Sequence, residues 1–342
     1  MKTIKQQIAI DDRGKRKKEG KLCRLRSGTS TSKFPELLVI GKNKKKNTTV
    51  VKKAFEMDKV AFKQLCSILS IPEEYIASCP PSLRSANINY WLSAVPKVKK
   101  VCLLLKEKVI RGIVDLEQKA RLFTNSAVIE IFEDLIKNGI SVTVPNEENT
   151  QIAIFPKIVP VWQYLSSTSM HISLMFPDEN LFFEGGDKKK GVFTGIHISN
   201  SEIGNHLFRM DYILHREASD STIILALDKK RMYRPKPGTT IEKLKEDITN
   251  VIIDLPKYKE KAESLIKKAR KKDIKDFKTW AELKRKKYRF NSALVRRGKE
   301  IFDGQEKNVW GACSALAKAA REKFDGERRY EMLSMLGLFL NV

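Results

Sequence analysis

The chain has 342 residues, of which 42% are hydrophobic, so it can bury a sizeable core and does not have the composition of a disordered protein. Its 66 Lys+Arg against 41 Asp+Glu give a formal net charge of +25, which exceeds what solubility requires and predicts a polyanionic partner. The longest apolar runs, at 101–105 and 223–227, have the length of strands, so we predict no membrane span and no membrane partner.

The cysteines indicate the compartment. Cys23, Cys66, Cys79, Cys102 and Cys313 are odd in number, widely spread and form no CxxC pair. This pattern is typical of a reducing cytoplasm and predicts neither a disulfide framework nor a zinc site. The basic start of the sequence lacks the apolar stretch of a secretory signal, so we expect a cytoplasmic protein.

In the first half of the chain, residues 1–53 are strongly basic and only ELLVI, at 36–40, resembles a strand, so their lysine clusters are expected in a flexible arm or at loop edges. Residues 58–69 predict a short amphipathic helix with Asp58 as its N-cap. The apolar runs within 101–115 predict a hairpin that turns at 106–108. A second helix is expected over 125–137, ending at Asn138-Gly139.

Residues 140–228 consist of short apolar runs broken by turn residues, which indicates a β-rich body. Thr239 and Glu242 predict a capping box for the first of several helices, and further helices are expected at about 258–285, 291–302, 308–323 and 328–340. We therefore predict an α+β fold with a β-rich central body of antiparallel hairpins, flanking helices and a helical C-terminal region. Its parts are a basic arm (1–53), a mixed core (54–238) and helices packed on that core (239–342).

The stretch 192–216 contains three of the four histidines and could hold a metal or form part of a sheet. Apolar residues alternate along 192–198 and 206–214, and the intervening NSEIGN is rich in turn formers, so a β-hairpin is predicted. A metal site would require His197, His206 and His215 to converge. His206 and His215 are separated by nine residues and would point to opposite faces of one strand, so we predict no metal site.

Other catalytic and cofactor motifs are scarce. No P-loop, GxGxxG or GxSxG motif is present, so we predict no cofactor. One string, Pro177-Asp178 followed by Asp187-Lys188-Lys189, fits the spacing of nucleases in which Asp178 and Asp187 hold Mg²⁺ and Lys189 assists hydrolysis. The surrounding EGGDKKKG is typical of a surface loop rather than of the strand that this chemistry needs.

Three segments carry a resemblance: FKQLCSILSIPEEYIASCPPSL with NINYWL, then GIHISNSEIGNHLFRMDYILHR, then VWGACSALAKAAREKFDGERRYEMLSMLGLFL. In this order they resemble a phage- and plasmid-associated prokaryotic family catalogued as a domain of unknown function, number 932 in that series. The chain departs from the family where a cysteine and Asn-Gly often follow the hairpin, since it has His215-Arg216-Glu217-Ala218. The resemblance implies a mobile element in a prokaryotic cytoplasm and transfers no catalytic residue.

Positive charge is concentrated in two segments. Residues 1–53 contain 17 basic and 4 acidic residues, residues 228–300 contain 25 and 11, and the rest of the chain has a net charge of −2. In the second segment Tyr233, Trp280 and Tyr288 are interleaved with cations, which suits single strands if the rings are exposed, although helical spacing also fits rings in a core. The predicted binding residues are Arg13, Lys15, Arg16, Lys17, Lys18, Arg24, Arg26, Lys44, Lys45, Lys46, Lys229, Lys230, Arg231, Tyr233, Arg234, Lys268, Arg270, Lys271, Lys272, Lys284, Arg285, Lys286, Lys287, Tyr288 and Arg289.

These observations favour a non-enzymatic DNA-binding protein of a phage or plasmid that holds or anneals single-stranded DNA during replication or recombination. Annealing proteins commonly form homo-oligomers, and the sequence is compatible with one. Two alternatives stay open. One is a metal-dependent nuclease that uses Asp178, Asp187 and Lys189, and the other is an RNA-binding or virion-associated structural protein.

Overall fold

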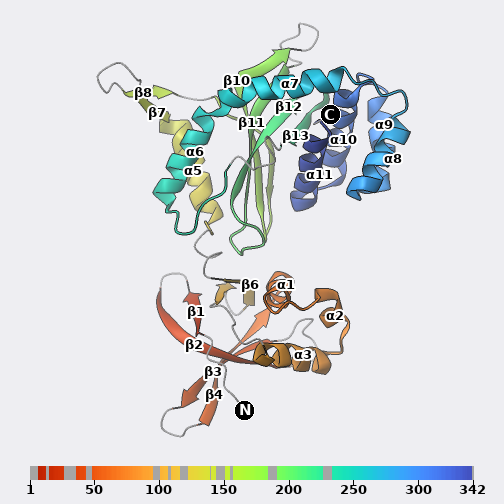
Figure 1. Ribbon diagram of the computed structural model, residues 1–342. Coiled ribbons are helices and arrows are strands. Elements are labelled where there is room, and N and C mark those ends of the chain that lie inside the picture. Colours follow the sequence, from red (N-terminus) through yellow and green to blue (C-terminus); the bar gives the residue numbers. More distant parts are fainter. Residues whose placement is uncertain are drawn as a thin grey trace. The chain divides into compact units, whose positions relative to one another are not determined.

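The chain folds into two compact units (Figure 1). Unit 1 comprises Met1–Leu122 with Glu202–Leu207, and unit 2 comprises Phe123–Ser201 with Phe208–Val342. The computed structural model describes residues 7–12, 15–26, 36–43, 48–94, 101–106, 109–115, 122–138, 140–143, 151–154, 157–183, 191–225 and 233–340. Runs of strands and runs of helices follow one another along the chain, and the α+β prediction is confirmed.

Among its described residues, unit 1 is a closed barrel with three helices. Its strand order is β1-β2-β3-β4-β6-β5, in which β1 pairs in parallel with β5 and β4 with β6, while the other neighbours are antiparallel. The elements are β1 (Gln7–Asp12), β2 (Lys15–Arg26), β3 (Glu36–Asn43), β4 (Thr48–Met57), α1 (Lys59–Ile68), α2 (Glu73–Ser78), α3 (Pro81–Ala94), β5 (Val101–Lys106) and β6 (Val109–Asp115).

Local signals explain α1 and the β5–β6 hairpin. The Asp58 carboxylate accepts a hydrogen bond from the Ala61 backbone N–H at 2.8 Å and caps α1, as predicted. The predicted hairpin is also confirmed. The expectation of a flexible arm or loop edges is wrong for residues 15–18, because they begin the long strand β2.

The segment Glu202–Leu207 packs within unit 1 although it connects two strands of unit 2. The Gln64 amide donates a hydrogen bond to the Ile203 carbonyl at 3.0 Å and accepts one from the Ile113 N–H at 2.7 Å. A Cβ at Gly112 would lie 2.4 Å from the same Ile203 carbonyl oxygen, so only glycine permits this approach. The turn residues from Glu202 onward are therefore a structural part of unit 1.

Unit 2 is built on a five-stranded antiparallel sheet with the order β13-β12-β11-β10-β9. The predicted hairpin over 192–216 is confirmed as β11 and β12, with Ile198 opposite Met210. A separate pair, β7 and β8, completes the strands of this unit. They are β7 (Ile140–Thr143), β8 (Gln151–Ile154), β9 (Val159–Leu165), β10 (Met170–Phe183), β11 (Gly191–Asn200), β12 (Arg209–Arg216) and β13 (Ser221–Leu225).

Helices flank the sheet (Figure 1), and α10 and α11 pack on β13. Nearly all of α10 is buried, and its small residues let neighbouring helices approach closely. The helices are α5 (Asn125–Asn138), α6 (Ile241–Ile253), α7 (Lys259–Arg270), α8 (Phe277–Tyr288), α9 (Ser292–Phe302), α10 (Val309–Lys323) and α11 (Gly326–Phe339).

Two details of the helical region differ from expectation. The single helix predicted at 258–285 is two helices, because the Ile274 N–H donates to the Lys307 carbonyl at 2.8 Å and Asp276 caps the start of α8. The first helix is capped by Thr240 rather than Thr239, since the Thr240 hydroxyl accepts from the Lys243 N–H at 3.2 Å.

The contact between α11 and β13 depends on a glycine. A Cβ at Gly337 would lie 2.0 Å from the Ile224 carbonyl oxygen, which is backbone and cannot move aside freely. Gly337→Ala should therefore lower the free energy of unfolding by about 2 kcal/mol or more in urea denaturation, as overpacking does. Gly304→Ala is the control, because its Cβ would meet only the Ile301 carbonyl at 3.9 Å. Equal stability of the two variants would contradict this account of the contact.

Candidate nucleic-acid interface

A set of exposed cations lies on α7, on α8 and on the segment between them. None of them forms an ion pair with another residue in the part of the chain that the structure describes. Unpaired, hydrated ammonium and guanidinium groups can neutralise phosphates without first breaking a salt bridge. We call this set the α7–α8 cationic surface: Lys268, Lys271, Lys272, Lys275, Lys278, Lys286, Lys287 and Arg289.

Other predicted cations of this region have structural partners. Arg270 donates to the Glu306 carboxylate at 2.9 Å, and Arg285 donates to Glu282 at 2.6 Å. The Lys284 ammonium lies 5.2 Å from the centre of the Phe339 ring. Arg270 in particular belongs to a partly buried arrangement, because the same Glu306 carboxylate oxygen lies 3.3 Å from Arg216 of β12. These side chains are held by the fold and are less available to a ligand.

The aromatic rings of the second basic segment pack into unit 2. The Tyr233 hydroxyl donates to the Asp247 carboxylate at 2.6 Å, and burial together with that carboxylate raises its pKa. The rings of Trp280 and Tyr288 both pack on Phe339, with Tyr288 at 5.0 Å between centroids. Their helical spacing thus reflects a core rather than a stacking surface for bases. Within the α7–α8 cationic surface, the Lys287 ammonium lies 5.3 Å from the centre of the Tyr288 ring, and Lys287 stays exposed.

The predicted residues of the first basic segment belong to unit 1 or lie outside the described residues. Six of them, Lys15, Arg16, Lys17, Lys18, Arg24 and Arg26, belong to β2. Four more of the first segment and three of the second lie outside the residues that the structure describes: Arg13, Lys44, Lys45, Lys46, and Lys229, Lys230, Arg231. The remaining one, Arg234, follows Tyr233 and is exposed.

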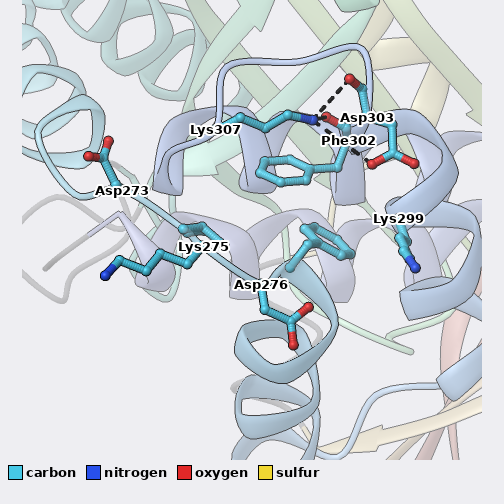
Figure 2. Close-up of a pocket in the computed structure, with 9 residues that line it drawn as sticks. Asp273, Lys275, Asp276, Lys299, Phe302, Asp303 and Lys307 are labelled. Carbon is cyan, nitrogen blue, oxygen red and sulfur yellow. Dashed lines mark hydrogen bonds and ion pairs between the residues drawn. The ribbon is translucent and has the colours of Figure 1, made fainter.

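A pocket of about 610 Å³ opens beside the start of α8 (Figure 2). Three lysines and three aspartates line it around Phe277 and Phe302, so its charges balance and it does not favour an anion. The Lys307 ammonium donates to the carbonyls of Phe302 and Asp303, at 3.0 and 2.9 Å. These bonds close the turn after α9. We therefore interpret the pocket as a structural feature that supports the segment between α7 and α8.

A row of polar side chains crosses one face of the large sheet under α11. The Ser173 hydroxyl lies 2.9 Å from Nδ1 of His197, and His197 Nε2 lies 3.3 Å from Nδ1 of His171. Nε2 of His171 lies 3.3 Å from Glu327, which also accepts from Arg209 at 2.8 Å. A Ser–His contact is typical of an activated nucleophile, but Ser173, His171 and His197 are fully buried, so no substrate reaches them.

The structure brings together different histidines from those that the sequence singled out. His197 contacts His171 on β10. No local motif in the sequence indicated that His171 would be its partner. His215 lies with Nδ1 3.2 Å from the Thr222 hydroxyl on the neighbouring strand β13. His206 lies in the turn before β12, which begins at Arg209, so the expectation that it belongs to the strand is wrong.

The structure describes one of the three residues of the nuclease hypothesis. Asp178 lies in β10, beside an irregularity in the pairing with β11 between Phe176 and Asn180. Asp187 and Lys189 lie outside the described residues.

The comparisons with known proteins found no relative. No family model matches the chain, and no curated protein or solved structure does so either. Among the described residues, no helix combines the length and the apolar character that crossing a bilayer requires.

Burial of His215 should make stability depend on pH. Desolvation, aided by the charge of Arg321, lowers its pKa from 6.5 to about 4. Because the unfolded chain then binds the proton more tightly, stability is full above pH 6.5 and falls as the pH drops towards 4. The loss from this group between pH 7.5 and 5 should be about 2 kcal/mol, measured by urea unfolding. His215→Asn should remove that part of the slope, and an unchanged slope would contradict the assignment.

Proposed function

We propose that the protein binds single-stranded nucleic acid, with single-stranded DNA as the favoured ligand. The observation that carries the proposal is the α7–α8 cationic surface, in which eight exposed cations lack ion-pair partners among the described residues. Paired lysines are common on this protein, as Lys243 with Glu246 and Lys257 with Asp254 illustrate. A cluster that leaves its cations unpaired creates a local positive potential that attracts polyanions.

The chemistry of this surface favours contacts to the backbone of the nucleic acid. Lysine ammonium groups neutralise phosphates whatever the sequence, and the nearby rings of Trp280 and Tyr288 pack on Phe339. We therefore expect binding with little sequence preference and strong dependence on salt. If about six to ten phosphates are contacted, affinity should fall by about 10³ to 10⁵ between 50 and 200 mM salt.

A pair of charge-removing variants tests the surface. Lys286→Gln with Lys287→Gln should weaken binding of a fluorescent oligo-dT, followed by anisotropy, and should lower the slope of log affinity against log salt by about 1.4, which is 0.7 for each lost contact to a single strand. The control is Lys243→Gln with Lys245→Gln on α6, which removes the same charge from lysines paired with Glu246 and Asp134.

Equal slopes for the two double variants would mean that only net charge matters and that the α7–α8 cationic surface is no binding site. Absence of binding by the wild-type protein in dilute buffer would end the proposal. Competition of oligo-dT with duplex DNA and with RNA of equal length at fixed salt ranks the ligands. The same labelled strand with Mg²⁺ or Mn²⁺ tests cleavage, and cleavage that Asp187→Ala abolishes would favour the nuclease instead.

A further inference from the structure

Helix α3 of unit 1 has apolar side chains on two opposite faces. Ile88 and Leu92 are buried on one face, as expected for a helix packed on a barrel. Leu83 and Tyr90 lie on the opposite face and Trp91 beside them, and all three are exposed, Tyr90 to 64% and Trp91 to 42% of the residue surface. A single exposed aromatic needs no explanation, but adjacent large rings on an outward face indicate a contact surface.

The neighbouring helix α2 adds a third ring. Tyr75 is 53% exposed, and its hydroxyl accepts a hydrogen bond at 3.2 Å from the side-chain amide of Asn87. Asn87 precedes Tyr90 and Trp91 by three and four residues, so it lies on the same face of α3. The three rings therefore border one region of unit 1, which we call the aromatic patch: Tyr75, Tyr90 and Trp91.

The patch is built on a rigid support. The Arg84 guanidinium donates hydrogen bonds to three carbonyls at the end of α2, those of Ile76, Ala77 and Cys79, at 3.1, 2.8 and 3.1 Å. These bonds satisfy carbonyls that the helix end leaves open and fix α2 against α3. The rings of Tyr90 and Trp91 meet edge to face at 5.7 Å between centroids. Rings held in place beforehand lose little entropy when a ligand stacks on them.

The sequence of the strand beside α3 indicates the kind of ligand. Helix α3 packs beside β2 (Figure 1), whose twelve residues KRKKEGKLCRLR include seven cations and one carboxylate. A helix that carries exposed rings and packs beside a strand rich in basic residues matches a single-stranded nucleic acid, in which bases stack on aromatic faces while cations follow the phosphates. An apolar protein partner would explain the rings but not the cationic strand. Glu73 and Glu74 precede Tyr75 and repel phosphate, so Tyr75 should contribute least.

We propose that the aromatic patch is a base-stacking surface for single-stranded nucleic acid, with Trp91 and Tyr90 as its principal rings. This inference rests on the proposed function and assigns different parts of the ligand to different surfaces of the protein. The α7–α8 cationic surface contacts phosphates only, whereas the patch contacts bases. It follows that the two surfaces should differ in their response to removal of the bases from the ligand.

The test compares oligo-dT with an abasic deoxyribose-phosphate chain of equal length, both followed by anisotropy. Wild-type protein should bind oligo-dT more tightly than the abasic chain. Tyr90→Ala with Trp91→Ala should weaken oligo-dT binding about tenfold or more and leave binding of the abasic chain unchanged. Lys286→Gln with Lys287→Gln should weaken both ligands by the same factor. Leu165→Ala is the control for loss of an exposed apolar side chain in unit 2.

A second variant guards against misfolding. Tyr90→Phe with Trp91→Phe keeps both aromatic faces and should keep the preference for oligo-dT, and thermal melting of all variants should coincide because the rings are exposed. Oligo-dT should also quench emission in the wild type more than in Trp91→Phe.

The outcomes separate the inference from the proposed function. If the alanine variant retains the wild-type preference for oligo-dT, the inference is wrong while the proposed function stands. If the wild type binds neither chain, both are wrong. An oligo-U arm reports whether RNA stacks equally well.

Discussion

The Glu306 carboxylate holds together the part of unit 2 on which the cationic helices are mounted. It accepts from Arg270 of α7, pairs with Arg216 of β12 and accepts from the Asn308 side chain that caps α10. Arg216 is almost fully buried, and a buried guanidinium without a carboxylate is strongly unfavourable. A single acidic side chain therefore fixes a helix end, a strand and a helix start, and through them the position of α7 and of the segment leading to α8.

The polar row under α11 has a comparable role in the sheet. Along β10, His171 and Ser173 alternate with Ile172 and Leu174, and their partners on β11 alternate in the same way. A slip of one residue would exchange the two faces, so that the imidazoles would face apolar neighbours without their partners. The same arrangement would be costly if incomplete, since buried polar groups are stable only when satisfied. The row thus favours one register of β10 against β11.

Much of the fold could be predicted from local signals, and the failures share a cause. The Asp58 cap, the β11–β12 hairpin and the helix at α5 depend on residues close in sequence. The break between α7 and α8 depends on the bond between Ile274 and Lys307, which no local pattern reveals. The inward position of Trp280 depends on Phe339 in the same way. The exposure of Tyr90 and Trp91 could not be predicted from the sequence, because an apolar residue on a helix ordinarily belongs to the core.

The placement of Glu202–Leu207 in unit 1 bears on the order in which the chain folds during synthesis. Domains commonly fold as they emerge from the ribosome, the N-terminal one first. Here Gln64 and Gly112 make their contacts with Ile203, which is translated long after the barrel strands. The N-terminal unit is therefore completed only when the first strands of the large sheet have also emerged.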